Sequence, residues 1–260
     1  MAAPERGDGP ERRDVPAPER GHAPAIVFVH ATRLTGAQWA AQVAELSPEF
    51  RCFTPDLPGH GTNAAVPFSL EDATRGITEL IEAEAGGQAI LVGLSLGGYV
   101  AMDVAARRSD LVRGLVLAGV TVEPGGLRSA PFRALARLYG SAPEPWLVRQ
   151  QVRSFRRYPA RIADPILADG FTFRSGAAAV RSLVGERFRP RLAAYPGPIL
   201  LVNGQRDLLF RLGARSFAAA AMDARTVVIR GAGHRSNLDE PEAFTAAVRS
   251  FARRIAADPA

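Results

Sequence analysis

The chain has 260 residues, of which 47% are hydrophobic and 22% are charged, so it is long and apolar enough for one sizeable α/β domain. This composition excludes a fully disordered polymer, and no apolar run approaches the roughly 20 residues that a membrane span needs. All 32 basic residues behind the net charge of +6 are arginines, which is more typical of a compositional bias than of a phosphate-binding surface. We therefore expect no nucleic-acid partner and no membrane partner.

Residues 1–24 repeat Pro, Glu, Arg, Gly and Ala without helical or strand periodicity, which predicts a disordered tail. Charge and proline stand where a secretory signal needs a continuous apolar stretch, so we expect a cytoplasmic protein. A single cysteine, Cys52, excludes an internal disulfide and a cysteine metal cluster, and we expect it to fill space in the core.

Six short apolar runs predict β-strands, and segments with helical spacing lie between most of them. The predicted strands are 25–30, 51–54, 89–92, 114–118, 199–202 and 226–229. The predicted helices are 37–46, 70–84, 96–107, 216–222 and 242–255. This alternation implies right-handed crossovers and an α/β fold with a mostly parallel central sheet and flanking helices. Such a sheet binds ligands beyond the carboxyl ends of its strands.

Residues 122–195 interrupt the alternation, because they contain helix-like stretches and no convincing strand. They hold thirteen arginines against five acidic residues, and nine of the 19 aromatic residues of the chain. A concentration of aromatic residues in an insertion suggests an apolar surface that faces inward. We therefore expect a helical cap, inserted after the fourth strand into a core formed by residues 25–121 and 196–260.

The sequence Gly93-Leu94-Ser95-Leu96-Gly97-Gly98 follows the third predicted strand and opens a helical pattern. A Gly-x-Ser-x-Gly sequence in this context is typical of a nucleophile elbow, a sharp turn that exposes the serine hydroxyl at a helix N-terminus. Glycine supplies the small neighbours that the strained serine needs. The alternative is a glycine-rich turn whose serine only caps the helix.

Two later loops carry the residues that could activate this serine. Asp207 lies just past the strand at 199–202, and His234 follows the strand at 226–229. Serine, acid and histidine in this order form one known arrangement of a catalytic triad. We predict that His234 accepts the Ser95 proton and returns it to the leaving group, while Asp207 fixes the imidazole tautomer. Glu123, after the fourth strand, is an alternative acid.

The oxyanion that forms in such a reaction needs two backbone N–H donors. We expect one from Leu96, directly after the nucleophile, and one from the loop after the first strand, at Thr32.

In order and spacing, these motifs resemble the α/β-hydrolase family over about residues 25–256. VFVHATRLTGAQW resembles its oxyanion loop, DLPGHG its loop after the next strand, GLSLGG its elbow, NGQRD its acid loop and GAGHRSNLDEPEAF its histidine loop. The family usually has glycine where this chain has Ala31, and a positive φ at that position would cost alanine about 1 kcal/mol. The family also opens with an antiparallel hairpin, which we expect to be missing or degenerate here.

The resemblance implies a serine hydrolase that cleaves a carboxylic ester, lactone or thioester of a small to medium, largely apolar substrate through an acyl-enzyme on Ser95. Non-hydrolytic acid/base chemistry on the same scaffold, such as a lyase reaction, carbon–carbon cleavage or cyclisation, stays open, and a non-catalytic ligand receptor is the least favoured alternative. The mechanism needs no metal ion and no organic cofactor. We expect a small-molecule substrate and a monomer or homodimer.

Candidate substrate contacts are Arg33, beside the oxyanion loop, and the cap aromatics Trp146, Phe155, Tyr158 and Phe171. A solvated arginine, and aromatic residues that only fill the core of the cap, are the alternatives.

Overall fold

A single parallel sheet organises the computed structural model, which describes residues 23–257. Within them, six strands run in the order β2-β1-β3-β4-β5-β6, and every neighbouring pair is parallel. The strands are β1 (Ala25–Val29), β2 (Arg51–Phe53), β3 (Ala89–Leu94), β4 (Val112–Ala118), β5 (Pro198–Gly204) and β6 (Asp223–Ile229). The predicted α/β class is confirmed. The predictions of a disordered tail and of a missing hairpin concern residues that lie almost entirely outside the described ones.

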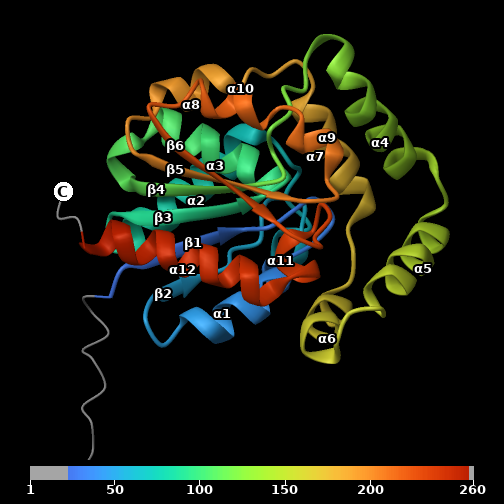
Figure 1. Ribbon diagram of the computed structural model, residues 1–260. Helices are drawn as coiled ribbons and strands as arrows, with labels where there is room; N and C mark the ends of the chain where they lie inside the picture. The colour runs from blue at the N-terminus through green and yellow to red at the C-terminus, as the bar shows by residue number, and fades with distance from the viewer. Residues whose placement is uncertain (1–22, 258–260) are drawn as a thin grey trace, which may run out of the picture.

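Helices cover both faces of the sheet, as Figure 1 shows. One face carries α2 (Leu70–Ala83), α3 (Leu96–Arg107), α8 (Arg189–Ala194) and α10 (Ala214–Ala218), and the other carries α1 (Ala40–Leu46) and α12 (Pro241–Ala257). Successive side chains of a strand point to opposite faces, so β1 contributes Val27 and Val29 to one core and Ile26 and Phe28 to the other. This burial on both faces explains the continuous apolar runs in the sequence.

The helix predicted at 216–222 begins and ends earlier, because α10 covers Ala214–Ala218. After Ala218 the chain tightens: the Ala220 N–H donates to the Phe217 carbonyl at 3.1 Å and the Ala221 N–H to the Ala218 carbonyl at 3.3 Å. Such i to i−3 bonds end an α-helix in a turn, which here leads into β6.

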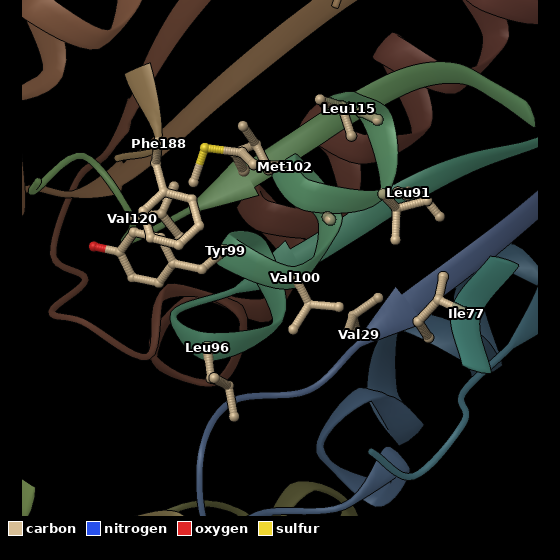
Figure 2. Close-up of a cluster of buried hydrophobic side chains, with 14 of the residues drawn as sticks. Val29, Ile77, Leu91, Leu96, Tyr99, Val100, Met102, Leu115, Val120 and Phe188 are labelled. Atoms are coloured by element: carbon tan, nitrogen blue, oxygen red, sulfur yellow. The ribbon is translucent and has the colours of Figure 1, made fainter. Parts of the chain in front are cut away.

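The helix that follows the elbow, α3, lies against the middle of the sheet. Its Tyr99, Val100 and Met102 are fully buried, and Figure 2 shows them among the side chains of Val29 and Leu115 from the neighbouring strands. Each aliphatic side chain buried in this way contributes roughly 1.5–3 kcal/mol. The start of α3 is therefore held firmly relative to the carboxyl ends of β1, β3 and β4.

Four helices between β4 and β5 form the insertion. They are α4 (Ala130–Ser141), α5 (Glu144–Phe155), α6 (Ala160–Asp169) and α7 (Phe173–Leu183), and we call them the cap. Figure 1 shows α4, α5 and α6 as an arc on the side of the molecule toward which the strands point. Tyr139, Leu147, Phe173 and Ala177 form a small core within the cap.

The last helix of the interval predicted as the insertion, α8, packs against α3 on the face of the sheet. Its Arg191 pairs with Asp103 of α3 at 2.8 Å and with Glu186 at 2.6 Å. None of the helices in residues 23–257 has the length and the apolar character needed to cross a membrane.

Candidate active site

Ser95 occupies a strained turn between β3 and α3. Its φ is 55° and its ψ is −118°, in a region that residues with a Cβ rarely enter. A Cβ on Gly93 would lie 2.6 Å from the Gly98 Cα, and one on Gly97 would lie 2.0 Å from the Val29 carbonyl oxygen. The glycines around the serine are therefore required by close contact between backbone segments, as the sequence pattern predicted.

Asp207 and His234 meet at the carboxyl ends of β5 and β6. The imidazole Nδ1 lies 2.7 Å from the Asp207 Oδ2, and because an ionised carboxylate only accepts, the ring donates from Nδ1. Asp207 is buried, whereas about a third of the His234 side chain is exposed. The Phe210 ring stacks on the imidazole at 4.7 Å between centroids. This arrangement leaves the other ring nitrogen, Nε2, as a proton acceptor.

The same strand end connects Ser95 to this pair. The Ser95 N–H donates to the Ala118 carbonyl at 2.9 Å. The next residue, Gly119, has a φ of 59°, and a Cβ on it would lie 2.9 Å from the His234 ring. Ser95, Asp207 and His234 thus gather around the end of β4. Within the described residues, the Ser95 hydroxyl makes no hydrogen bond to the imidazole, and in ligand-free enzymes such bonds are often long.

Glu123, the alternative acid, is bound elsewhere. Its carboxylate accepts from the Arg189 side chain at 2.8 Å and from the Phe188 backbone N–H. These bonds tie the segment after β4 to the start of α8. Of the two candidate acids, Asp207 is the one that the fold brings to His234.

The loop after β1 lies beside the first turn of α3, because the Gly97 position touches the carbonyl groups of Val29 and His30. In the described part of the chain, the backbone N–H groups of Thr32 and Leu96 have no hydrogen-bond partner. Two free backbone N–H groups on neighbouring segments, one after β1 and one at the start of α3, are what an oxyanion needs.

His30 and Gln38 hold this loop, and the sequence reasoning gave neither a role. The His30 Nδ1 donates to the Ala31 carbonyl, and its Nε2 accepts from the Leu57 N–H, both at 2.9 Å. Gln38 Oε1 accepts from the Ala31 N–H at 2.8 Å. Burial lowers the pKa of His30 to about 3, so the ring stays neutral and Nε2 remains an acceptor. A histidine that directly follows a buried apolar strand is the signal that could have found this role.

The strain considered for Ala31 is absent. The left-handed residue of the loop is Arg33, with a φ of 70°, and Ala31 has no positive φ. The loop makes its sharp turn two residues later than the family pattern suggested, so alanine carries no backbone penalty at position 31.

The cap rests on this same loop. Arg33 donates from Nη1 to the Tyr139 hydroxyl of α4 at 2.7 Å and to Gln151 Oε1 of α5 at 3.2 Å. The Thr35 hydroxyl donates to Asp169 at the end of α6 at 2.6 Å. A residue of α7 completes the set, since the Thr32 hydroxyl donates to the carbonyl of Gly176 at 3.3 Å. Every cap helix therefore contacts the segment that carries the candidate oxyanion donor.

The structure brings three of the four predicted cap aromatics together. Phe155 is fully buried, and its ring lies 5.9 Å from Tyr158 and 5.5 Å from Phe171 between centroids. Trp146 is 43% exposed and stacks on no other aromatic ring among the described residues.

Arg235, which sequence reasoning did not single out, connects the cap to the histidine loop. It follows His234 directly, donates from Nη2 to the Ser154 hydroxyl of α5 at 2.8 Å, and lies 4.7 Å above the centre of the Phe155 ring. Behind it, Asp239 accepts from the Gly233 N–H at 2.7 Å and from the Tyr158 hydroxyl at 2.5 Å. These contacts fix the loop on both sides of the imidazole.

Potential metal ligands are scattered through the described residues. No three His, Cys, Asp or Glu side chains among them lie close enough together to hold an ion.

A sequence model of the alpha/beta hydrolase family matches residues 26–247. The chain belongs to this family. Among curated members, it is 30% identical to a pimeloyl-[acyl-carrier protein] methyl ester esterase of Xanthomonas campestris pv. campestris (strain B100), with 89% of this chain and 96% of the relative aligned. The corresponding protein of Xanthomonas oryzae pv. oryzae (strain MAFF 311018) is 29% identical, with 90% of this chain and 97% of the relative aligned.

Solved structures of other α/β-hydrolases superpose over most of the chain. A thermophilic esterase from Thermogutta terrifontis has a TM-score of 0.75 and 27% identity, covering 90% of this chain and 91% of its own. An enol-lactonase from Burkholderia xenovorans LB400 has the same TM-score and 26% identity, covering 90% and 92%. The prediction that this α/β-hydrolase is a hydrolytic enzyme is confirmed.

Proposed function

We propose that this α/β-hydrolase cleaves a carboxylic ester with Ser95 as nucleophile, His234 as general base and Asp207 as the residue that orients the imidazole. The observation that carries the proposal is the 2.7 Å bond from His234 Nδ1 to Asp207, beside a serine held in the strained turn of an elbow. A hydroxyl is a weak nucleophile at neutral pH, and a neighbouring imidazole with a fixed tautomer is the usual means of activating it.

In the first half of the reaction, His234 Nε2 takes the Ser95 proton while Oγ bonds to the carbonyl carbon. The carbonyl electron pair moves to the oxygen, where the N–H groups of Thr32 and Leu96 donate to the resulting oxyanion. As the carbonyl re-forms, the bond to the leaving oxygen breaks and His234 returns the proton to it. The alcohol departs and an acyl-Ser95 remains.

In the second half, water takes the place of the serine. His234 accepts a proton from the water as its oxygen attacks the acyl carbon, and the same two N–H groups stabilise the second oxyanion. Collapse of this intermediate breaks the bond to Ser95 Oγ, which regains a proton from His234. The products are a carboxylic acid and the free enzyme.

The substrate class is supported by the cap and by the relatives. Phe155, Tyr158 and Phe171 form an aromatic group next to the histidine loop, which suits a small to medium, largely apolar ester, lactone or thioester. Relatives and structural neighbours are named as a methyl ester esterase, an esterase and an enol-lactonase, and all of these names refer to the cleavage of an ester or a lactone.

A fluorophosphonate probe and p-nitrophenyl esters test this proposal. The probe is expected to label Ser95, and the esters to give an acyl adduct on the same residue by mass spectrometry, with Ser95→Ala as the unreactive control. No labelling and no nitrophenol release would remove the proposal. Turnover of a substrate without any acyl-Ser95 would instead favour acid/base chemistry on the same scaffold.

A further inference from the structure

Two arginines stand next to the candidate active site without a carboxylate partner. Arg33 follows the oxyanion donor Thr32, and Arg235 follows His234. Their side-chain hydrogen bonds go to neutral groups: Arg33 donates to a phenol, an amide and a backbone carbonyl, and Arg235 donates to a hydroxyl. Within residues 23–257 neither forms an ion pair.

Withdrawing a cation from water without a counter-ion is unfavourable. Burial lowers the pKa of both guanidinium groups below the usual arginine value, and the charge of Arg235 acts in the same direction on Arg33. The Asp239 carboxylate offsets part of this effect at Arg235 without forming an ion pair with it. By comparison, the guanidinium of the half-buried Arg191 forms ion pairs with Asp103 and Glu186. Among the described residues, the half-buried Arg51 and Arg254 also form no ion pair, with Arg51 donating to backbone carbonyls. What distinguishes Arg33 and Arg235 is their place, directly after Thr32 and His234.

One face of α5 holds the two arginines near each other. Gln151, which binds Arg33, and Ser154, which binds Arg235, are three residues apart and therefore neighbours on the helix surface. Tyr139 lies within electrostatic range of both cations. The pair thus ties the oxyanion loop and the histidine loop to the same cap helix, α5.

Each guanidinium keeps donors that are not used within the protein. Arg33 uses Nη1 twice and Nε once, which leaves its Nη2 group, and Arg235 uses only Nη2, which leaves Nη1 and Nε. None of these nitrogens belongs to the sealed, unpartnered polar atoms of the described residues. They therefore keep some access to solvent and are available to a ligand.

We propose that Arg33 and Arg235 bind an ionised carboxylate of the substrate, at the opposite end from the ester that Ser95 attacks. The substrate is then a half-ester of a dicarboxylic acid, with an apolar chain along the cap aromatics. The planar carboxylate matches the fork of N–H groups on each guanidinium and supplies the negative charge that the fold leaves out. This proposal rests on the hydrolytic function proposed above and names its substrate class.

A matched pair of substrates provides the test: p-nitrophenyl hydrogen adipate, which carries a free carboxylate, and p-nitrophenyl methyl adipate, in which that group is a neutral ester. The readout is the ratio of kcat/KM for the acid to kcat/KM for the methyl ester. We expect a ratio of about 10 or more in the native enzyme, since a charge-assisted pair is worth roughly a factor of 10 to 100. A ratio of 1 or less would overturn the proposal.

Variants locate the effect. Arg33→Gln and Arg235→Gln are each expected to move the ratio toward 1, and Arg235→Lys to retain part of it. Arg149→Gln, an exposed arginine on the same helix α5, is the matched control and should keep the native ratio. An unchanged ratio in both glutamine variants would overturn the assignment. If Arg33→Gln does not fold, an unchanged ratio in Arg235→Gln alone would overturn it.

Two further measurements separate the possible failures. Hydrolysis of neither ester, without fluorophosphonate labelling of Ser95, would contradict the hydrolytic function itself. In that case, calorimetric binding of monomethyl adipate to Ser95→Ala, and its loss in Ser95→Ala with Arg235→Gln, still tests the carboxylate site. Preference for an equivalent p-nitrophenyl ester with a terminal phosphate over the carboxylate would overturn the carboxylate assignment.

Discussion

The elbow and the cap contact one segment, the end of β1 and the loop after it (residues 29–35), by different means. The elbow approaches through backbone atoms, so that a Cβ on Gly97 would overlap the Val29 carbonyl. The cap approaches mainly through side chains, with Arg33 on Tyr139 and Gln151, and Thr35 on Asp169. It adds one backbone bond, from the Thr172 N–H to the Arg33 carbonyl at 3.2 Å. The loop that carries a candidate oxyanion donor is thus fixed rigidly on one side and adaptably on the other.

This difference suggests that the elbow side preserves the geometry of the reaction, whereas the cap side sets the selectivity for the substrate. Backbone contacts tolerate almost no substitution, so they preserve the geometry on which bond cleavage depends. A side-chain contact can be replaced at a cost of about 1 kcal/mol. Substitutions in the cap can therefore change which substrate is bound while the geometry of the elbow is preserved. The predictions below compare the two sides.

The largest difference is expected between the two acids that follow neighbouring strands. Asp207→Asn should lower kcat by about 10,000-fold, because an amide stabilises the wrong imidazole tautomer. Glu123→Gln should leave kcat within about tenfold, because Glu123 binds Arg189 and the Phe188 N–H instead. Steady-state kinetics on a p-nitrophenyl ester compares them, and equal losses would contradict the assignment of the acid.

Two glycines on opposite sides of the loop should respond differently to alanine. In Gly97→Ala the new methyl would lie 2.0 Å from a backbone oxygen, and we expect a loss of about 3 kcal/mol or more in unfolding free energy. In Gly176→Ala the nearest atoms, at 2.9 and 3.0 Å, belong to the side chains of Thr32 and Arg33.

For Gly176→Ala we expect a change of about 1 kcal/mol or less, because alanine gains roughly 0.8–1 kcal/mol of helix propensity against the small shift of those side chains. Urea denaturation measures both variants. Similar losses in the two would mean that the cap contacts the loop as rigidly as the elbow does.

The pH dependence of the unfolding free energy should report the protonation of His30, the buried histidine that directly follows β1. The pKa of His30 is about 3 in the folded protein against 6.5 for an ordinary histidine, so between these values the unfolded chain binds more protons. The unfolding free energy should therefore fall as the pH drops below about 6.5, by about 1.4 kcal/mol per unit, and burial of His60 adds in the same direction.

Urea denaturation at pH 7 and pH 5 checks this slope. His30→Gln should be less stable at pH 7 because one or both loop bonds are weakened, yet its stability should depend less on pH. A variant with the native slope would show that His30 is not the group that resists protonation.

The smallest effect is expected on the cap side of the loop. Asp169→Asn weakens the bond from the buried Thr35 hydroxyl, and because the Asp169 side chain itself is exposed we expect a loss of about 0.5–1 kcal/mol. Limited proteolysis should cut the cap faster while the core stays intact. A loss of several kcal/mol would mean that the cap and the core unfold as one unit.

Local patterns predicted the strands and the elbow because each depends on residues close in the sequence. A buried parallel strand is a run of apolar residues, and a strained turn needs glycine at fixed positions around Ser95. The same reasoning placed Asp207 and His234 at strand ends, which a parallel sheet brings to one edge. It placed the start of α10 two residues too late and its end four residues too late, because alanine-rich segments carry little information on where a helix begins and ends.

Sequence by itself therefore determined the fold class, the order of the chemistry-bearing residues and the edge of the sheet where they lie. Only the tertiary structure decided which acid meets the imidazole, where the loop after β1 turns, and that Arg33 and Arg235 share one helix of the cap without a counter-ion. These features depend on contacts such as Asp207 to His234, 27 positions apart, and Arg33 to Gln151, 118 positions apart, and no periodicity along the chain encodes such separations.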